Sequence, residues 1–269
     1  MRVGLVIEYD GTEFHGSQLQ PNARTVQGEI ENALHRIFEK DIRLYLASRT
    51  DSGVHARGQV ARFDVDKDME PDQVRKALNH YMDKDVRIRC AQLVQDGPDG
   101  FDPRGDASAR TYFYSFNDAP SAPAIERRTV THVRKSLQAD RMNAAAATLI
   151  GSHDFKAFAG PSAPADASTR RVVESASVER DGDVVRFEIT ANAFLHQQIR
   201  RTAGVLYSVG VGDADVDRME HLVTGGSRGE AAHVMPARGL NLEKISYNGS
   251  GECGLPAFAT ADTTNLGVN

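Results

Sequence analysis

The stretch LASRTDSGVHARGQVARF, from Leu46 to Phe63, joins two runs in which apolar and polar residues alternate, a pattern typical of β-strands. The alternation over residues 42–46 predicts a strand before the loop, and residues 59–65 predict another strand after it. Between them, residues 50–53 read Thr-Asp-Ser-Gly, which is good turn chemistry. The stretch therefore predicts two strands that present a loop at the edge of a sheet.

The loop carries more charge than a turn requires. Arg49, Asp51, His55 and Arg57 fall within nine residues. An ionised carboxylate among cations can attack an electron-poor carbon or stabilise a glycosidic cation, and it can also serve as a plain turn residue. The spacing alone leaves these roles open for Asp51.

Upstream and downstream of this loop, the first part of the chain alternates strands and helices. Residues 3–7 alternate as a strand, Thr25 can cap a helix over residues 26–38, and Pro71 opens a second helix that is followed by a strand near residues 86–90. With the two strands around the loop, the order is βαββαβ, which is the ferredoxin-like split unit with a largely antiparallel sheet.

The second part repeats this mixture of elements. The run ARTYFYSFN (residues 109–117) predicts a strand, Asp181-Gly182 predicts a hairpin turn, and helices are expected over residues 139–151 and 194–210 and after Asp215. A last strand is expected over residues 242–247. We expect an α+β protein with an N-terminal half over residues 1–106, a C-terminal half over residues 107–248 and a loose tail over residues 249–269.

Composition narrows the possible functions. The chain has 269 residues, of which 40% are apolar and 26% charged, which is typical of a globular protein. It has no apolar run near ~20 residues and no signal-peptide pattern, so we expect no membrane association. Cys90 and Cys253 are far apart without a pairing pattern, which argues against a disulfide and favours a reducing cytoplasm.

Common cofactor and metal motifs are missing from the sequence. It contains no GxxxxGK[ST] phosphate loop, no complete dinucleotide-binding glycine motif, no GxSxG turn and no metal-type histidine spacing. We therefore expect no cofactor and no metal, and chemistry carried by carboxylate, tyrosine and arginine side chains.

The net charge of −5 conceals an uneven distribution. Acids concentrate in residues 64–72 and 213–220, ahead of predicted helices, whereas residues 24–62 carry seven Lys or Arg against five acids. On charge alone, a local basic face and a mixed solvated surface are equally compatible with residues 24–62.

The segment ASRTDSGVHARGQV (residues 47–60) closely resembles the signature of the tRNA pseudouridine synthase A family. Further similar segments follow in the order typical of that family: VIEYDGTEFHG (6–16), TVQGEIENAL (25–34), ASARTYFYSF (107–116), ANAFLHQQIRRTAG (191–204) and PARGLNL (236–242). The matches extend from about Met1 to Tyr247. The resemblance implies the pseudouridine synthase fold, with two ferredoxin-like halves around a central active-site cleft.

The resemblance also implies a role for individual residues. Asp51 is expected to be the catalytic nucleophile, Tyr112 to stack on the target uracil and help deprotonate C5, and Arg200 to pair with Asp51 across the cleft. RNA contacts are expected from the remaining members of the predicted site: Arg49, His55, Arg57 and Arg104.

Four departures from the family pattern bear on RNA contacts. Ser48 stands where glycine is usual, and Ser17 stands where tryptophan is common. FDPR (residues 101–104) replaces a usual FHAR, and LNHYMDKDV (residues 78–86) differs from a Leu/Pro-rich segment.

The implied function is isomerisation of uridine to pseudouridine at positions 38, 39 or 40 in the anticodon stem-loop of tRNA, by a cytoplasmic homodimer without a cofactor. Two other functions fit the residues. A nucleosidase or glycosidase would need a second carboxylate near Asp51, for which Glu8 and Asp10 are the candidates. A non-catalytic RNA-binding module would use the ferredoxin-like sheet as a platform.

Overall fold

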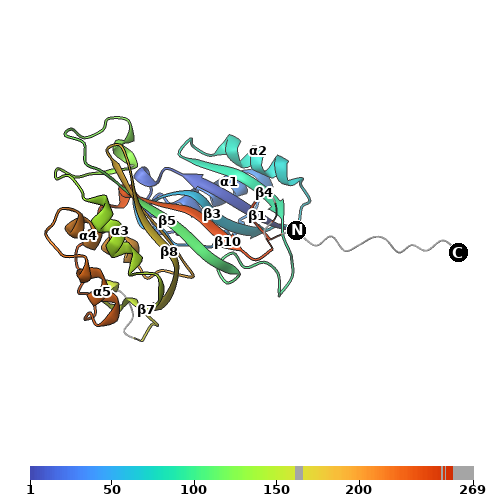
Figure 1. Ribbon diagram of the computed structural model, residues 1–269. Coiled ribbons are helices and arrows are strands. Elements are labelled where there is room, and N and C mark those ends of the chain that lie inside the picture. Colours follow the sequence, from blue (N-terminus) through green and yellow to red (C-terminus); the bar gives the residue numbers. More distant parts are fainter. Residues whose placement is uncertain (161–165, 250, 252, 257–269) are drawn as a thin grey trace.

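The arrangement of strands and helices was obtained from a computed structural model, which describes residues 1–160, 166–249, 251 and 253–256 (Figure 1). The strands are β1 (Arg2–Tyr9), β2 (Tyr45–Leu46), β3 (His55–Asp64), β4 (Val86–Leu93), β5 (Ala107–Asn117), β6 (Thr131–His132), β7 (Gly151–Asp154), β8 (Arg170–Asp181), β9 (Val184–Ala191) and β10 (Leu240–Tyr247). The α-helices are α1 (Val26–Phe38), α2 (Pro71–Tyr81), α3 (Ala139–Ala147), α4 (Gln198–Gly210) and α5 (Asp217–Thr224). Short 3-10 helices are η1 (Gly11–Glu13), η2 (Glu126–Arg128), η3 (Phe155–Phe158) and η4 (Ala237–Gly239).

The first half has the predicted ferredoxin-like topology. Its strands lie in the order β4-β1-β3, β2 pairs with β3, and all of these pairings are antiparallel. The helices begin where the sequence predicts: the Thr25 hydroxyl accepts a hydrogen bond from the Gly28 amide, and Pro71 is at the start of α2. Ile30 and Leu34 of α1 are fully buried, which contributes on the order of 2 kcal/mol each.

The second half repeats the same topology. Its strands lie in the order β10-β5-β9-β8, with β7 added outside β8 and β6 beside β5. The β8–β9 hairpin turns where predicted, after Asp181, and Gly182 there has a φ of 56°, which glycine adopts without a Cβ clash. Figure 1 shows α1 and α2 accompanying the N-terminal strands, while α3, α4 and α5 gather at the other end of the sheet.

The two halves join through one parallel pairing. β10 pairs with β3 at Asn241–His55 and Leu242–Ala56, so the described strands form a single ten-stranded sheet that is otherwise mostly antiparallel. This pairing begins β3 at His55, four residues before the predicted start. The expected α+β class and largely antiparallel sheet are therefore confirmed.

Three predicted elements are shorter than expected, the first being the helix expected over residues 139–151, which ends at Ala147. The strand over residues 42–46 is reduced to Tyr45–Leu46, because only these residues pair with β3. The helix expected from residue 194 begins at Gln198, since Gln197 has a φ of 60° that a right-handed helix cannot contain.

The expectations for the cysteines and the tail are corrected. Cys90 of β4 is disulfide-bonded to Cys253, which lies 163 residues away in the sequence. Local cysteine spacing cannot predict a pair that is so far apart. The described part of the tail is packed rather than loose: Leu255 is fully buried, and Gln92 Nε2 donates a hydrogen bond to Pro256 O. Residues 250, 252 and 257–269 of the expected tail lie outside the described residues.

Among the helices of the described chain, none is long and apolar enough to cross a membrane.

Candidate functional site

Asp51 follows β2 in a loop that is held on both sides by the segment Phe14–Ser17. The Ser17 amide donates to Thr50 O at 3.1 Å, and the Gly53 amide donates to Phe14 O at 3.3 Å. Two glycines permit this arrangement: Gly53 has a φ of 78°, and a Cβ on Gly16 would lie 2.9 Å from Thr50 O. The carboxylate is thus presented by a loop with a defined conformation.

The two carboxylate oxygens of Asp51 face two residues from the other half. Arg200 Nη1 lies 3.0 Å from Asp51 Oδ2, and His196 Nε2 lies 3.2 Å from Asp51 Oδ1. Arg200 is fixed further by its Nε, which donates to Met235 O at 2.7 Å. The left-handed Gln197 turns the chain between the two residues, and the side chain of Asp51 keeps 24% exposure.

Tyr112 lies on β5, two positions from Tyr114 on the same face, and is only 6% exposed. Its ring and that of Phe194 form an edge-to-face pair with 5.3 Å between centroids, and its hydroxyl lies 3.0 Å from Ser48 Oγ. Burial raises the pKa of Tyr112 above its usual value, and the charge of Asp51 adds to this effect. The phenol is therefore neutral at neutral pH and sits close enough to Asp51 to sense its charge.

Comparison with known proteins identifies the family. Residues 5–96 and 145–248 match the family described as tRNA pseudouridine synthase. A tRNA pseudouridine synthase A from Methylobacterium nodulans is 40% identical over 91% of this chain and 96% of its own length, and one from Brevibacillus brevis is 36% identical over 91% and 99%. A solved structure titled "Crystal Structure of a Cbf5-Nop10-Gar1 Complex" covers 91% of this chain and 58% of its own, with 9% identity and a TM-score of 0.37, which is too low to support a conclusion.

The chain belongs to the tRNA pseudouridine synthase A family. It is therefore a pseudouridine synthase, an isomerase of tRNA uridine, and its mixed sheet and helices are consistent with the pseudouridine synthase fold.

Two arginines of the predicted RNA-binding set are exposed in this synthase. Arg49 is two residues before Asp51, and no carboxylate of the described chain lies within ion-pair distance of it. Arg104 lies in the turn before β5, where its carbonyl accepts a hydrogen bond from Arg110 Nη2 at 2.9 Å. Both side chains are thus available to an anionic ligand.

His55 has a different position from the one expected. It is 6% exposed, its Nδ1 accepts from the Gly11 amide at 3.1 Å, and its Nε2 lies 2.8 Å from Arg128 O. Because the ring is buried and both nitrogens are engaged, His55 holds loops together, and the expectation that it contacts RNA is not supported.

Arg57 is not brought together with Asp51 and Tyr112. Its guanidinium lies 5.4 Å from the ring centroid of Phe113 and 3.7 Å from Glu243 Oε2. Side chains alternate along a strand, so Phe113 is on the face of β5 opposite to Tyr112. An RNA contact by Arg57 would therefore occur on the other face of the sheet.

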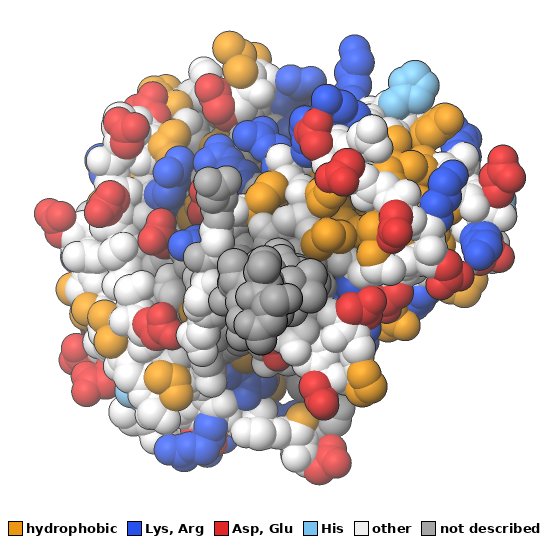
Figure 2. All heavy atoms as spheres, turned by 90° about the vertical axis from the view of Figure 1, so that its right-hand side faces the viewer, with side chains coloured by type: hydrophobic (Ala, Val, Ile, Leu, Met, Phe, Trp, Pro, Cys, Tyr) orange, Lys and Arg blue, Asp and Glu red, His pale blue; other side chains and the backbone are white. Residues whose placement is uncertain are grey.

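The possible basic face over residues 24–62 is largely neutralised. Five of its seven cations lie within 4 Å of carboxylates, in the pairs Arg24–Asp85, Lys40–Asp66, Arg43–Glu31, Arg57–Glu243 and Arg62–Asp64. Figure 2 likewise shows basic and acidic side chains interspersed on the face it presents. The mixed solvated surface is the description that fits, with Arg36 and Arg49 as the two cations that have no carboxylate of the described residues within ion-pair distance.

Two contacts of the site were missed by sequence reasoning. His196 precedes Arg200 by four residues, a spacing that could have suggested a shared partner. In the sequence, Ser48 stands out only as a departure from the family pattern, and no sequence signal links it to Tyr112, which is 64 residues away.

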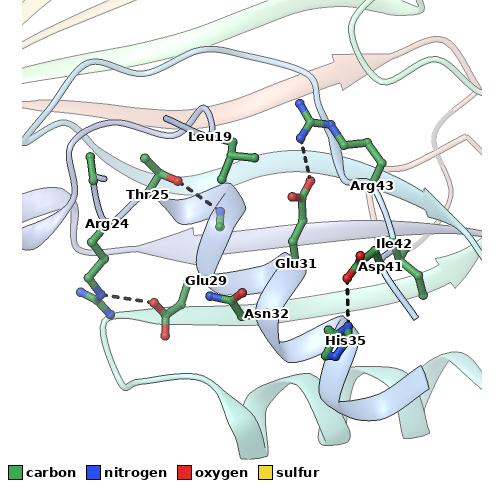
Figure 3. A pocket seen from close by; sticks show the side chains of 12 residues that line it. Leu19, Arg24, Thr25, Glu29, Glu31, Asn32, His35, Asp41, Ile42 and Arg43 are labelled. Atoms are coloured by element: carbon green, nitrogen blue, oxygen red, sulfur yellow. Dashed lines mark hydrogen bonds and ion pairs between the residues drawn. The ribbon is translucent and has the colours of Figure 1, made fainter. Parts of the chain in front are cut away.

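A groove of about 670 Å³ runs along α1, apart from all the predicted site residues (Figure 3). Its ionised side chains are paired, with Arg24 beside Glu29 and Arg43 beside Glu31. Since these charges already neutralise one another, the groove gives no reason to propose a ligand. Among the described residues, no group of three or more His, Cys, Asp or Glu could hold a metal ion.

Proposed function

We propose that this synthase converts uridine to pseudouridine at position 38, 39 or 40 of the tRNA anticodon stem-loop, with Asp51 as nucleophile and without a cofactor. The observation that carries the proposal is the ion pair between Asp51 Oδ2 and Arg200 Nη1 at 3.0 Å, which spans the two halves beside Tyr112. The resemblance of residues 47–60 and 191–204 to the family motifs supports the same assignment.

The chemistry needs a carboxylate but no redox group. The N1–C1′ bond breaks, the base turns, and C5 joins C1′ as the C5 proton leaves. Asp51 assists by adding to the base or the sugar, or by promoting elimination to a glycal, and Arg200 keeps its carboxylate oriented. The base must first leave the helical stack, which costs a few kcal/mol.

Stacking on Tyr112 is proposed to offset part of that cost. Because Tyr112 is only 6% exposed and its ring pairs with that of Phe194, we propose that Phe194 moves aside when a uracil stacks on Tyr112. Phe194 is partly exposed and precedes the first turn of α4, so its displacement leaves the buried face of that helix intact.

The RNA backbone is proposed to meet Arg49 and Arg104, whose side chains are exposed. We further propose that residues 1–106 and 107–248 act as two lobes around the site, and that two chains form a homodimer that grips one tRNA. The tRNA substrate supports a cytoplasmic location. Unpaired cysteines no longer support that location, because Cys90 and Cys253 are disulfide-bonded.

The nucleosidase alternative is weakened by the positions of Glu8 and Asp10, the two candidates for its second carboxylate. Glu8 pairs with Arg89 at 2.7 Å, and Asp10 accepts from the Thr12 amide at 3.0 Å and faces Arg128. Each candidate is thus engaged away from Asp51. The non-catalytic module is disfavoured by family membership, since the relatives are named as synthases.

The test is incubation with tRNA tritiated at uridine C5. Release of tritium to water together with pseudouridine in the digested RNA supports the proposal. Free uracil would identify a nucleosidase, and unchanged RNA that remains bound would identify a binding module. Substrates with a single uridine at position 38, 39 or 40 establish which positions react.

A further inference from the structure

Ser48 is in direct contact with the hydroxyl group of Tyr112. The Ser48 Oγ and Tyr112 Oη atoms are 3.0 Å apart, and either can donate the hydrogen bond. Within the described chain, Ser48 is the only hydrogen-bond partner of the Tyr112 hydroxyl. The family that the sequence resembles usually has glycine here, so this hydroxyl is a feature of this chain.

The position of Ser48 is set by its backbone. The Ser48 amide donates to Gln59 Oε1 at 3.1 Å, and Gln59 Nε2 donates to Ser48 O at 2.8 Å. Because Gln59 is fully buried on β3, these two hydrogen bonds fix the position of the Ser48 backbone. The hydroxyl is therefore held in front of Tyr112 by the fold, and not by the choice of a rotamer alone.

A second departure from the family supports the same segment. Ser17, which stands where tryptophan is common, is fully buried, accepts from the Thr50 amide at 2.9 Å and donates to Ser48 O at 3.5 Å. The Ser17 side chain thus ties Ser48 to Thr50, the first and last residues of the short segment that leads to Asp51.

The protonation state of Tyr112 limits the proton transfers in which its hydroxyl can take part. Burial raises the pKa of the phenol, opposed by the Ser48 hydrogen bond and by Arg110, and Asp51 raises it further. A neutral phenol can take a proton only if it releases its own at the same time. Ser48, unlike the phenol that it contacts, is partly exposed to solvent.

We propose that Ser48 is a positioning residue of the isomerisation, whose hydroxyl relays the uracil C5 proton from Tyr112 to solvent. The C5–H bond breaks, its electron pair stays in the uracil ring, and the proton moves to Tyr112 Oη. The phenolic proton moves to Ser48 Oγ, and the Ser48 hydroxyl proton moves to water. Both hydroxyls end neutral, and nothing is oxidised or reduced.

The relay rests on the proposed function, and single-turnover kinetics with tRNA carrying protium or deuterium at uridine C5 test it. We expect Ser48→Ala to slow pseudouridine formation about tenfold, with tRNA affinity within about twofold of the parent. The C5 isotope effect should exceed that of the parent, because C5–H cleavage becomes slower. Ser48→Thr keeps a hydroxyl and should remain within about threefold of the parent rate.

Thr111→Val is the matched control, because it removes a hydroxyl that pairs with Thr190 at 2.9 Å on the other face of β5. It should change neither the rate nor the isotope effect. The relay is overturned if Ser48→Ala has the isotope effect of the parent, or if Ser48→Thr is as slow as Ser48→Ala. A parent that releases no C5 hydrogen, or an Asp51→Asn variant as active as the parent, would instead overturn the proposed function itself.

Discussion

The two oxygens of Asp51 differ in their surroundings. Oδ2 faces Arg200, whose side chain is 15% exposed and is tied to Met235 O, whereas Oδ1 faces His196, whose side chain is 51% exposed. The Oδ2 side is thus closed by a fixed partner, and the Oδ1 side is bordered by a residue on the surface.

Asp51→Asn should abolish turnover while preserving the fold and tRNA binding, because it keeps the shape of the side chain and removes its negative charge. Turnover is measured by tritium release, folding by circular dichroism and binding by filter retention. Residual activity within about tenfold of the parent, a barrier change of only ~1.4 kcal/mol, would contradict the role of nucleophile.

Arg200→Ala should lower kcat about a hundredfold, equivalent to ~2.7 kcal/mol. Arg200→Lys should recover only part of this, since one ammonium cannot reproduce a planar guanidinium that contacts both Asp51 Oδ2 and Met235 O. Arg141→Ala removes an exposed pair with Asp215 and serves as the control. Normal kinetics in Arg200→Ala would show that the ion pair is only structural.

At the scale of single elements, the ends of β5 and β8 are joined by a buried charge. The Asp118 side chain is 4% exposed, accepts from Arg180 Nη2 at 2.8 Å and accepts from the Leu137 amide at 2.8 Å. It therefore connects the end of β5, the end of β8 and the segment before α3. The Arg180 hydrogen bond lowers the pKa of Asp118.

Asp118→Asn should reduce the free energy of unfolding by about 2 kcal/mol at pH 7, as expected for a hydrogen bond to a charged group. A carboxyl whose pKa is lower in the folded state stabilises above its unfolded value of about 3.9 and loses that contribution as the pH falls through the folded value. The difference between parent and variant should therefore shrink below about pH 4. Urea unfolding over this pH range measures it.

Asp213→Asn provides the comparison, because Asp213 pairs with Lys135 at 3.2 Å on the surface and is 60% exposed. Its unfolding curve should match the parent. Equal effects from the two variants would mean that the Asp118 contacts contribute no more than an exposed pair.

At the scale of the whole molecule, charge is balanced locally although the net charge is −5. Most arginines between residues 24 and 62 are paired with carboxylates, and Arg57 lies on the face of the sheet opposite to Tyr112. Phosphate binding near the site must therefore depend on a few unpaired cations, among which Arg49 is the nearest in sequence to Asp51.

Affinity for tRNA should fall as salt rises, and the logarithmic slope should become shallower by about 0.9 in Arg49→Ala if that residue neutralises one phosphate. Arg57→Ala should leave the slope unchanged, since its guanidinium lies over Phe113 on the other face. The slopes are measured by titration at several salt concentrations. Affinity that is independent of salt, or equal slopes in Arg49→Ala and the parent, would contradict the contact.

Local patterns in the sequence were sufficient for most of the fold. The apolar stripe and the Thr25 cap defined α1, Pro71 defined the start of α2, and the turn at Asp181-Gly182 defined the β8–β9 hairpin. The motif around Asp51 indicated the family. These features depend on residues close together in the chain, so periodicity and turn chemistry reveal them.

Tertiary structure alone decided which distant residues meet. It brought Ser48 to Tyr112, His196 to Asp51 and Cys90 to Cys253, and it buried His55 between Gly11 and Arg128. Each of these contacts joins segments whose approach depends on the packing of a continuous sheet. A local sequence pattern carries no record of that packing, because the same serine, histidine or cysteine would fit equally well in a solvent-exposed loop.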